Sequence, residues 1–399
     1  MNRRLYGRGQ RAGLALTVGA VAVAALASSV LAASGFFSGN HNPWPYHAMS
    51  RPPVLAAVGD VSCQPGPPVE GEKASDVCTG DTTRNAAQTA TANQIEQMQP
   101  DLVAILGDEQ YQAGRYEDFM GSYDRTYGAF KFLQRPAPGN HEFYTSHGET
   151  GDNGDGYFDY YNGFQLNPDG SPVTDSFTTA TGSTFTQPKP RPLGQAGPAT
   201  NADGWYSYDL GTWHIISLNI ECAIQPGGCS TNGSWFASET NWLAQDLASD
   251  HAQCTLAYWH QPTFNASEGV TSSAEGEAAD AWWQLLYQHG ADVVLNGHDH
   301  VYARFAPMNP GGTVDTRKGI REFIVGTGGE SLDTVIPATP NLVTWADQYY
   351  GVMKLTLDQS SYSWDFESSL ENPGAPAGTP ATYSDTGNAR CHGSAHFGD

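Results

Sequence analysis

The residues with the clearest chemical potential are two histidines one residue apart, His298 and His300, just beyond an apolar run. Imidazole, carboxylate and amide groups bind divalent and trivalent metal ions, and further residues of these types stand at comparable positions. The full set is Asp60, Asp108, Asn140, His141, His260, His298 and His300. Taken singly, an aspartate after a strand is more often a turn residue, and one histidine is more often hydrogen-bonded than metal-bound. Their combination in one chain predicts a metal centre.

Most of these residues follow short apolar segments. The lengths and compositions of the segments predict buried strands at 54–58, 102–106, 255–259 and 292–295. Helical patterns are predicted at 83–99, 116–133, from 238 onward and at 278–289, and further strands at 205–210, 213–219, 322–325 and 352–357. Strands separated by helices predict an α/β protein, in which polar chemistry gathers beyond the carboxyl ends of the strands. The metal-ligand residue types are therefore expected at one edge of a sheet.

The first residues have the pattern of an export signal. Four arginines precede an apolar run over 12–26, and Val30-Leu31-Ala32 fits a signal peptidase site, which predicts a signal peptide over 1–32. A retained membrane anchor is the alternative, which the short apolar run disfavours. Residues 33–52 are predicted as a linker, and 53–399 as a single domain with an insertion loop over 145–203. We therefore expect a secreted or extracellular protein.

The charge of the chain limits its partners. The formal net charge is −23, and removal of residues 1–32 with their four arginines and no acidic residue moves it to −27. Such an acidic surface argues against duplex nucleic acid, and with no span beyond the signal we expect no stable membrane partner. An acidic protein still binds phosphate groups if it carries metal ions. The charge predicts no particular oligomeric state.

All six cysteines lie beyond the predicted signal peptide. An even number of cysteines in an exported chain favours disulfides over free thiols. We expect the near neighbours in sequence to pair and the last pair to follow by elimination, as Cys63–Cys78, Cys222–Cys229 and Cys254–Cys391. A cysteine zinc site is the alternative, but the chain has no C-x-x-C spacing to support it.

The motifs around the candidate ligands resemble those of the calcineurin-like metallophosphoesterases. The blocks agree in order and spacing, and they are Gly59-Asp60, Gly107-Asp108-Glu109-Gln110-Tyr111, Gly139-Asn140-His141-Glu142, Trp259-His260 and Gly297-His298-Asp299-His300. Tyr111, together with Ser62 where many members carry a histidine, is the pattern of the purple acid phosphatase branch. The resemblance implies a four-layer α/β/β/α sandwich with two mixed sheets and a dinuclear metal site at the carboxyl ends of the strands.

The resemblance also implies a ligand set for two metal ions. Its first site consists of Asp60, Asp108, Tyr111 and His300, and its second of Asp108, Asn140, His260 and His298, with Asp108 bridging the two. A phenolate and two carboxylates favour a trivalent ion, so iron is expected in the first site, and iron, zinc or manganese in the second. Tyr111 as a packed aromatic residue remains the alternative.

Other residues near the blocks have less certain roles. His141 is expected to protonate the leaving alkoxide, supported by Glu142 or a backbone carbonyl, with a structural role as the alternative. Arg304 would hold a phosphate oxygen or form a salt bridge. Because residues two apart in an extended segment point to the same side, His298 and His300 should share one cavity while Asp299 points away.

The implied function is a secreted phosphatase that hydrolyses small phosphomonoesters by attack of a metal-bound hydroxide. A phosphodiesterase or nucleotidase with the same metal core is the alternative. Gly269 and Val270 stand where plant-type relatives carry further histidines, which leaves the remaining phosphate contacts open. A catalytically silent binding protein would require a missing ligand, and none is missing from the sequence.

Overall fold

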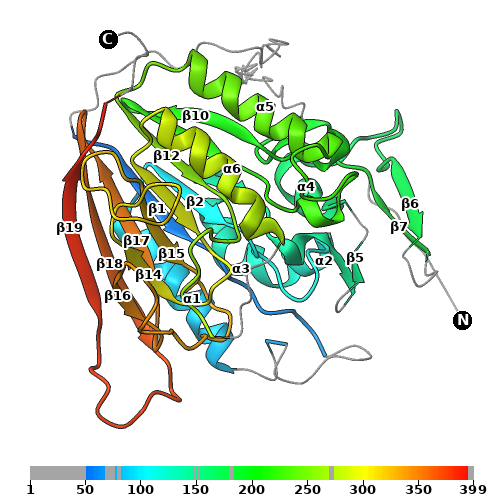
Figure 1. The fold of residues 1–399 in the computed structure, drawn as a ribbon. Helices are drawn as coiled ribbons and strands as arrows, with labels where there is room; N and C mark the ends of the chain where they lie inside the picture. The colour runs from blue at the N-terminus through cyan, green and yellow to red at the C-terminus, as the bar shows by residue number, and fades with distance from the viewer. Residues whose placement is uncertain are drawn as a thin grey trace, which may run out of the picture. The chain divides into compact units, whose positions relative to one another are not determined.

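The computed structural model describes residues 51–67, 77–78, 82–146, 149–150, 153–178, 184–268 and 274–393. The predicted signal peptide and most of the predicted linker lie outside these residues. Two large mixed sheets carry most of the described architecture (Figure 1). Among the residues described, no helix combines the length and the apolar composition needed to cross a bilayer.

The first sheet has six strands in the order β19-β18-β17-β1-β2-β3. Its parallel part is β1 (Val54–Val58), β2 (Leu102–Leu106) and β3 (Gln134–Ala137), and helix α1 (Thr82–Met98) connects β1 to β2. The antiparallel part is β17 (Tyr349–Leu357), β18 (Ser361–Glu371) and β19 (Ser384–Arg390). The sheet is therefore mixed, and the carboxyl ends of β1, β2 and β3 meet at one edge.

The second sheet has seven strands in the order β10-β11-β12-β13-β15-β14-β16. Strands β11 (Trp213–Ser217), β12 (Cys254–Tyr258), β13 (Val293–Asn296) and β15 (Arg321–Val325) run parallel. The antiparallel strands are β10 (Tyr206–Leu210), β14 (Tyr302–Phe305) and β16 (Leu342–Ala346). Helices α5 (Ser234–Ser249) and α6 (Ala274–Gln288) connect β11 to β12 and β12 to β13.

Alternation of side chains along β1 shows how the layers stack. Leu55 and Ala57 face a core shared with the second sheet, whereas Ala56 and Val58 face a core shared with α1. Helices α5 and α6 cover the outer face of the second sheet (Figure 1). The order helix, sheet, sheet, helix confirms the predicted four-layer α/β/β/α sandwich.

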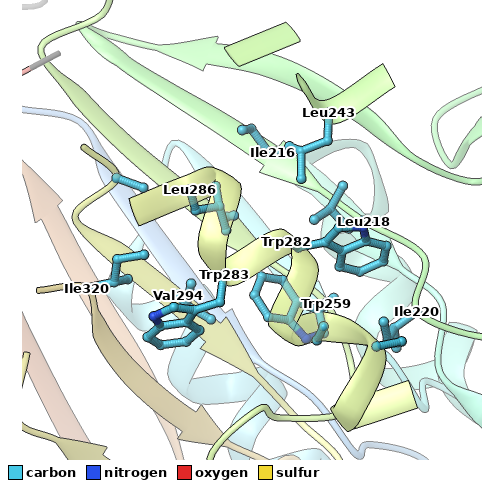
Figure 2. Close-up of a cluster of buried hydrophobic side chains, with 14 of the residues drawn as sticks. Ile216, Leu218, Ile220, Leu243, Trp259, Trp282, Trp283, Leu286, Val294 and Ile320 are labelled. Carbon is cyan, nitrogen blue, oxygen red and sulfur yellow. The ribbon is translucent and has the colours of Figure 1, made fainter. Parts of the chain in front are cut away.

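Large aromatic residues fill the layer beneath α6. Figure 2 shows Trp282 and Trp283 of this helix lying against Trp259 and Val294 of the second sheet. All four side chains are fully buried. Truncation of one such aromatic side chain typically costs about 3–5 kcal/mol, so this layer fixes α6 firmly on the sheet. The strand end that carries His260 is thereby held in place.

The predicted strands are confirmed to within three residues, the largest difference being β17, which begins at Tyr349 and not at 352. Three helices differ from their predictions. The expected helix over 116–133 is broken into α2 (Tyr116–Asp118), a π-helical turn (Phe119–Tyr123), α3 (Asp124–Thr126) and a 3-10 segment (Tyr127–Leu133). Gly121 and Gly128 lie within it and weaken its helical propensity. Helices α5 and α6 each begin one turn earlier than predicted. In α5 the extra turn buries Trp235 and Phe236.

Part of the segment over 145–203 belongs to the core. It contains helix α4 (Asp155–Asn162), in which Tyr157 and Phe158 are fully buried, and the hairpin β6–β7 (Thr174–Thr178 and Thr184–Pro188). Helix α4 was not predicted from the sequence, because it lies in a stretch dominated by Gly, Asp, Thr, Pro and Asn. The three expected disulfides, Cys63–Cys78, Cys222–Cys229 and Cys254–Cys391, are confirmed.

Candidate metal centre

The candidate ligands meet where the carboxyl ends of both sheets come together. Asp60 follows β1, Asp108 and Tyr111 follow β2, and Asn140 begins a 3-10 turn (Asn140–Phe143) just after β3. On the other sheet, His260 lies two residues beyond β12, while His298 and His300 lie between β13 and β14. Contact between the sheets is direct, because His260 Nε2 lies 3.1 Å from Asp108 Oδ2. The structure thus brings together all the predicted site residues.

One group of ligand atoms surrounds the hydroxyl of Tyr111. This oxygen lies 2.8 Å from Asp60 Oδ1, 2.9 Å from Asp108 Oδ2 and 3.1 Å from His300 Nε2. His300 Nε2 also lies 3.4 Å from Asp60 Oδ1. Ligand atoms that share one ion at about 2.0–2.2 Å from it are expected to lie roughly 3 Å apart, so the four atoms are spaced as ligands of a single ion.

A second group shares Asp108 with the first. His260 Nε2 lies 3.3 Å from His298 Nδ1 and 3.1 Å from Asp108 Oδ2. The ligand atoms of these three residues all lie within 4.8 Å of one another. Asn140 Oδ1 is buried and has no hydrogen-bond partner among the described residues. An unpaired buried carbonyl costs free energy, and a metal ion at this position would remove that cost.

Two of the three candidate ligand histidines are oriented by backbone carbonyls. His260 Nδ1 donates to the carbonyl oxygen of Leu106 at 2.8 Å, and His300 Nδ1 donates to that of Ser331 at 2.8 Å. Each bond leaves Nε2 as the nitrogen that faces the centre. Metal-binding histidines commonly use their second nitrogen in this way, which fixes the ring orientation and the tautomer.

Glu142 holds the two loops of the first sheet together. Its carboxylate accepts hydrogen bonds from the backbone N–H groups of Asp108 at 2.9 Å, Gly139 at 2.8 Å and Gln110 at 3.1 Å. Asp108 Oδ1 in turn accepts from the His141 backbone N–H at 2.9 Å. The fully buried Glu142 therefore ties the loop after β2 to the loop after β3. Of the two supports expected for the His141 ring, the structure shows the backbone carbonyl, that of Gln112.

Three of the candidate ligands have a strained backbone conformation. Asp60, Asp108 and His298 have φ angles of 60°, 49° and 69°, in the left-handed region that side-chain-bearing residues rarely adopt. Such conformations cost roughly 1–3 kcal/mol each and cluster at functional sites. The turn at His298 also corrects the expectation of an extended segment there. Asp299 does point away, because its carboxylate accepts from the backbone N–H of Ala266 at 2.9 Å.

The buried charges at the centre depend strongly on one another. Burial alone would raise the pKa of Asp108, but the neighbouring His260 and His141 rings outweigh it and hold that pKa well below its usual range. Burial opposes charging of His260, yet Asp108 raises its pKa to about 10. Burial and the His260 charge lower the pKa of His298 to about 3. In the absence of metal, a proton on His260 therefore balances the Asp108 charge, and a bound cation would take its place.

Tyr111 is surrounded by groups that disfavour the phenolate. Burial, followed by the charges of Asp108 and Asp60, raises its pKa well above the usual value. A tyrosine in this setting loses its proton only if a cation compensates the added charge. The surroundings therefore match a residue whose ionised form depends on a bound metal ion.

His141 and Arg304 lie in contrasting positions. His141 Nδ1 lies 2.8 Å from the carbonyl oxygen of Gln112, and its ring packs 4.2 Å from the ring of Tyr111. The guanidinium of Arg304 forms a bidentate ion pair with Asp385 at 2.7 and 3.0 Å between β14 and β19. Of the two roles expected for Arg304, the structure therefore shows the salt bridge. Gly269 and Val270 lie outside the described residues.

Two features of the site were not predicted from the sequence. The loop after β15 contains Gly326, Gly328 and Gly329 and packs against the Asp60 loop, where a Cβ at Gly326 would lie 2.7 Å from Asp60 Oδ2. The run Gly326-Thr327-Gly328-Gly329 after a predicted strand is the signal that could have revealed it. Tyr144 is the second feature, because its hydroxyl accepts a hydrogen bond from Asn140 Nδ2 at 3.2 Å.

A family model described as calcineurin-like phosphoesterase matches residues 55–302. The chain therefore belongs to that family, as the motifs predict. An acid phosphatase of Aspergillus ficuum is 26% identical over 225 residues, which cover 42% of this chain and 36% of that protein. Purple acid phosphatase 15 of Arabidopsis thaliana is 29% identical over 116 residues, or 28% of this chain and 20% of that protein. The chain thus spans about a third or less of these relatives.

The fold comparison agrees with the sequence comparison. The purple acid phosphatase PPD1 from yellow lupin seeds superposes with a TM-score of 0.52 and 18% identity, covering 86% of this chain and 55% of that one. This likeness establishes the fold, and with the relatives it confirms the purple acid phosphatase-like branch. Membership of this branch implies a dinuclear metal site.

Proposed function

We propose that this protein is a secreted phosphatase that hydrolyses small phosphomonoesters. The observation that carries the proposal is the convergence of every candidate ligand from five strand-end loops on one centre. The acid phosphatases among its relatives favour monoesters as substrates. The three disulfides fit an oxidising compartment, which supports export of the chain.

Two overlapping ligand sets would hold the metal ions. The first would consist of Asp60, Asp108, Tyr111 and His300, and the second of Asp108, Asn140, His260 and His298. The phenol and the carboxylates of the first set suit iron, whereas the second set suits iron, zinc or manganese. When bound, the two ions would supply the positive charge that polarises the phosphoryl group and lowers the pKa of a shared water molecule.

His141 is the proposed general acid. Because Nδ1 donates to the Gln112 carbonyl, Nε2 faces the centre, 3.9 Å from Asp108 Oδ2. The His141 side chain is 18% exposed, so part of the ring is open to solvent. In the protonated ring, Nε2–H would donate its proton to the leaving alkoxide as the phosphorus–oxygen bond breaks. The Gln112 carbonyl keeps the ring oriented during the transfer.

Hydrolysis of two chromogenic substrates tests the reaction type. We expect protein loaded with iron and zinc to hydrolyse 4-nitrophenyl phosphate much faster than bis(4-nitrophenyl) phosphate. The opposite preference would favour the phosphodiesterase alternative. Asp108→Asn should abolish hydrolysis of both, because it removes the bridging ligand, whereas His289→Asn near the end of α6 serves as the control and should retain activity.

The leaving group tests the role of His141. A 4-nitrophenolate leaves without much help from an acid, whereas an alkoxide needs protonation. We therefore expect His141→Asn to lower kcat more for an alkyl phosphate than for 4-nitrophenyl phosphate. Equal losses on both substrates would contradict the assignment and indicate a structural role.

A further inference from the structure

Tyr144 stands at the accessible side of the centre. Asp60, Asp108 and His260 are buried, whereas Asn140, His141 and Tyr144 are partly exposed. Tyr144 contacts both of its partly exposed neighbours. Its hydroxyl lies 3.2 Å from Asn140 Nδ2, and its ring centroid lies 4.9 Å from that of His141 in an edge-on arrangement. Tyr144 thus lies between a proposed ligand and the proposed acid.

The hydroxyl of Tyr144 has a proton to donate. A phenol accepts hydrogen bonds at its oxygen and donates one through its O–H group. If Asn140 binds a metal ion through Oδ1, its Nδ2 donates a hydrogen bond to the Tyr144 hydroxyl. The Tyr144 oxygen is then the acceptor in that bond. Within the described part of the chain, no residue accepts the Tyr144 proton. This proton is therefore available to a molecule that occupies the centre.

The surroundings of Tyr144 make such a donor useful. Carboxyl groups near it include those of Asp108, Glu221 and Glu275. Carboxylates accept hydrogen bonds and repel phosphate, whereas a phosphoryl oxygen needs a donor. A neutral O–H group meets that need without adding charge. Its position next to Asn140 and His141 places the donor where both the phosphoryl group and the leaving oxygen would lie.

We propose that the Tyr144 hydroxyl is a substrate-binding group that donates a hydrogen bond to a phosphoryl oxygen of the bound ester. This inference rests on the proposed phosphatase function. The same hydrogen bond would form to the product, inorganic phosphate, which retains that oxygen. The packing of the Tyr144 ring against His141 would also keep the acid beside the ester that it protonates.

The test is Tyr144→Phe, which keeps the ring against His141 and removes only the oxygen. One hydrogen bond corresponds to roughly a tenfold change in affinity. With the metal-loaded protein, we expect the Kd of inorganic phosphate, measured by calorimetry, to rise about tenfold. KM for 4-nitrophenyl phosphate should rise similarly, with kcat within about threefold of the wild-type value. Metal content, measured on the same samples, should stay unchanged.

The control is Tyr349→Phe, which removes a hydroxyl bonded to the carbonyl oxygen of Pro380 at 2.7 Å, on another part of the first sheet. It should leave phosphate binding unchanged. An unchanged Kd of phosphate in Tyr144→Phe would overturn the proposal. A loss of metal in proportion to the loss of binding would also overturn it, because Tyr144 would then only position Asn140. Failure of the wild-type protein to hydrolyse any phosphoester would instead overturn the phosphatase function itself.

Discussion

Gly139 lies where no side chain fits, and this provides a sharp test of the centre. A Cβ built at this position would lie 2.2 Å from Asp108 Oδ1 and 2.5 Å from the Asp108 backbone nitrogen. Real Cβ atoms essentially never approach within 3.0 Å, so Gly139→Ala must separate the two loops or displace the carboxylate by about 0.8 Å. Metal–ligand distances tolerate only about 0.2 Å. The substitution therefore moves the bridging ligand well beyond that tolerance.

A displacement of about 1 Å at a reacting centre costs roughly a hundredfold in rate. We therefore expect Gly139→Ala to lower kcat/KM for 4-nitrophenyl phosphate by about a hundredfold and to weaken metal binding in a chelator competition. The matched control is Gly311→Ala, where the added Cβ would meet only Asn309 Oδ1 at 3.5 Å. Near-normal activity and full metal content in Gly139→Ala would refute the assignment of Asp108 as the bridging ligand.

Three further substitutions test other parts of the structure. With iron in the first site, the wild-type protein should show a visible tyrosinate-to-iron absorption band that Tyr111→Phe loses; a colourless, iron-free and active enzyme would count against Tyr111 as a ligand. Burial opposes the charge on His214, but hydrogen bonds to carboxylates such as Asp246, at 2.7 Å, raise its pKa to about 10. The protonated His214 should contribute on the order of a few kcal/mol to the free energy of unfolding, in full below about pH 6.5, and this contribution should be lost as the pH rises through about 10. In urea unfolding, the difference in free energy between the wild-type protein and His214→Asn should therefore shrink between those pH values. Replacing Cys254 and Cys391 together by alanine opens a loop with a sequence separation of 137 residues and should cost about 5 kcal/mol in the same assay, and a loss below about 1 kcal/mol would contradict it.

The strands and most ligands were predictable because both leave local signals. Strands β1, β2, β12 and β13 are continuous apolar runs, and a buried strand must end where polar residues begin. The motif blocks follow those ends, so the resemblance named the candidate ligands that the structure brings together. The break in the helix over 116–133 was not predictable, because it includes close contacts with distant segments, such as that of Gly121 with Pro65.

The missed parts of the site depend on contacts between distant segments. The glycine-rich loop after β15 is required because Gly326 packs against Asp60, which is far away in sequence. Tyr144 gains its role only when the turn that begins at Asn140 brings its hydroxyl beside that amide. Arg304 could not be assigned between a phosphate contact and a salt bridge from its place after the His298 block, because the choice depends on Asp385, which is distant in sequence. The sequence motifs therefore identified the candidate ligands better than they identified the residues that surround those ligands.

The number of metal ions bound per chain tests the central claim most directly. It can be measured by mass spectrometry of the elements in the purified protein, with hydrolysis of 4-nitrophenyl phosphate followed on the same samples. We predict two metal ions per chain in active wild-type protein, and the loss of both metal and activity in Asp108→Asn. Full activity in protein that contains no metal would contradict the claim.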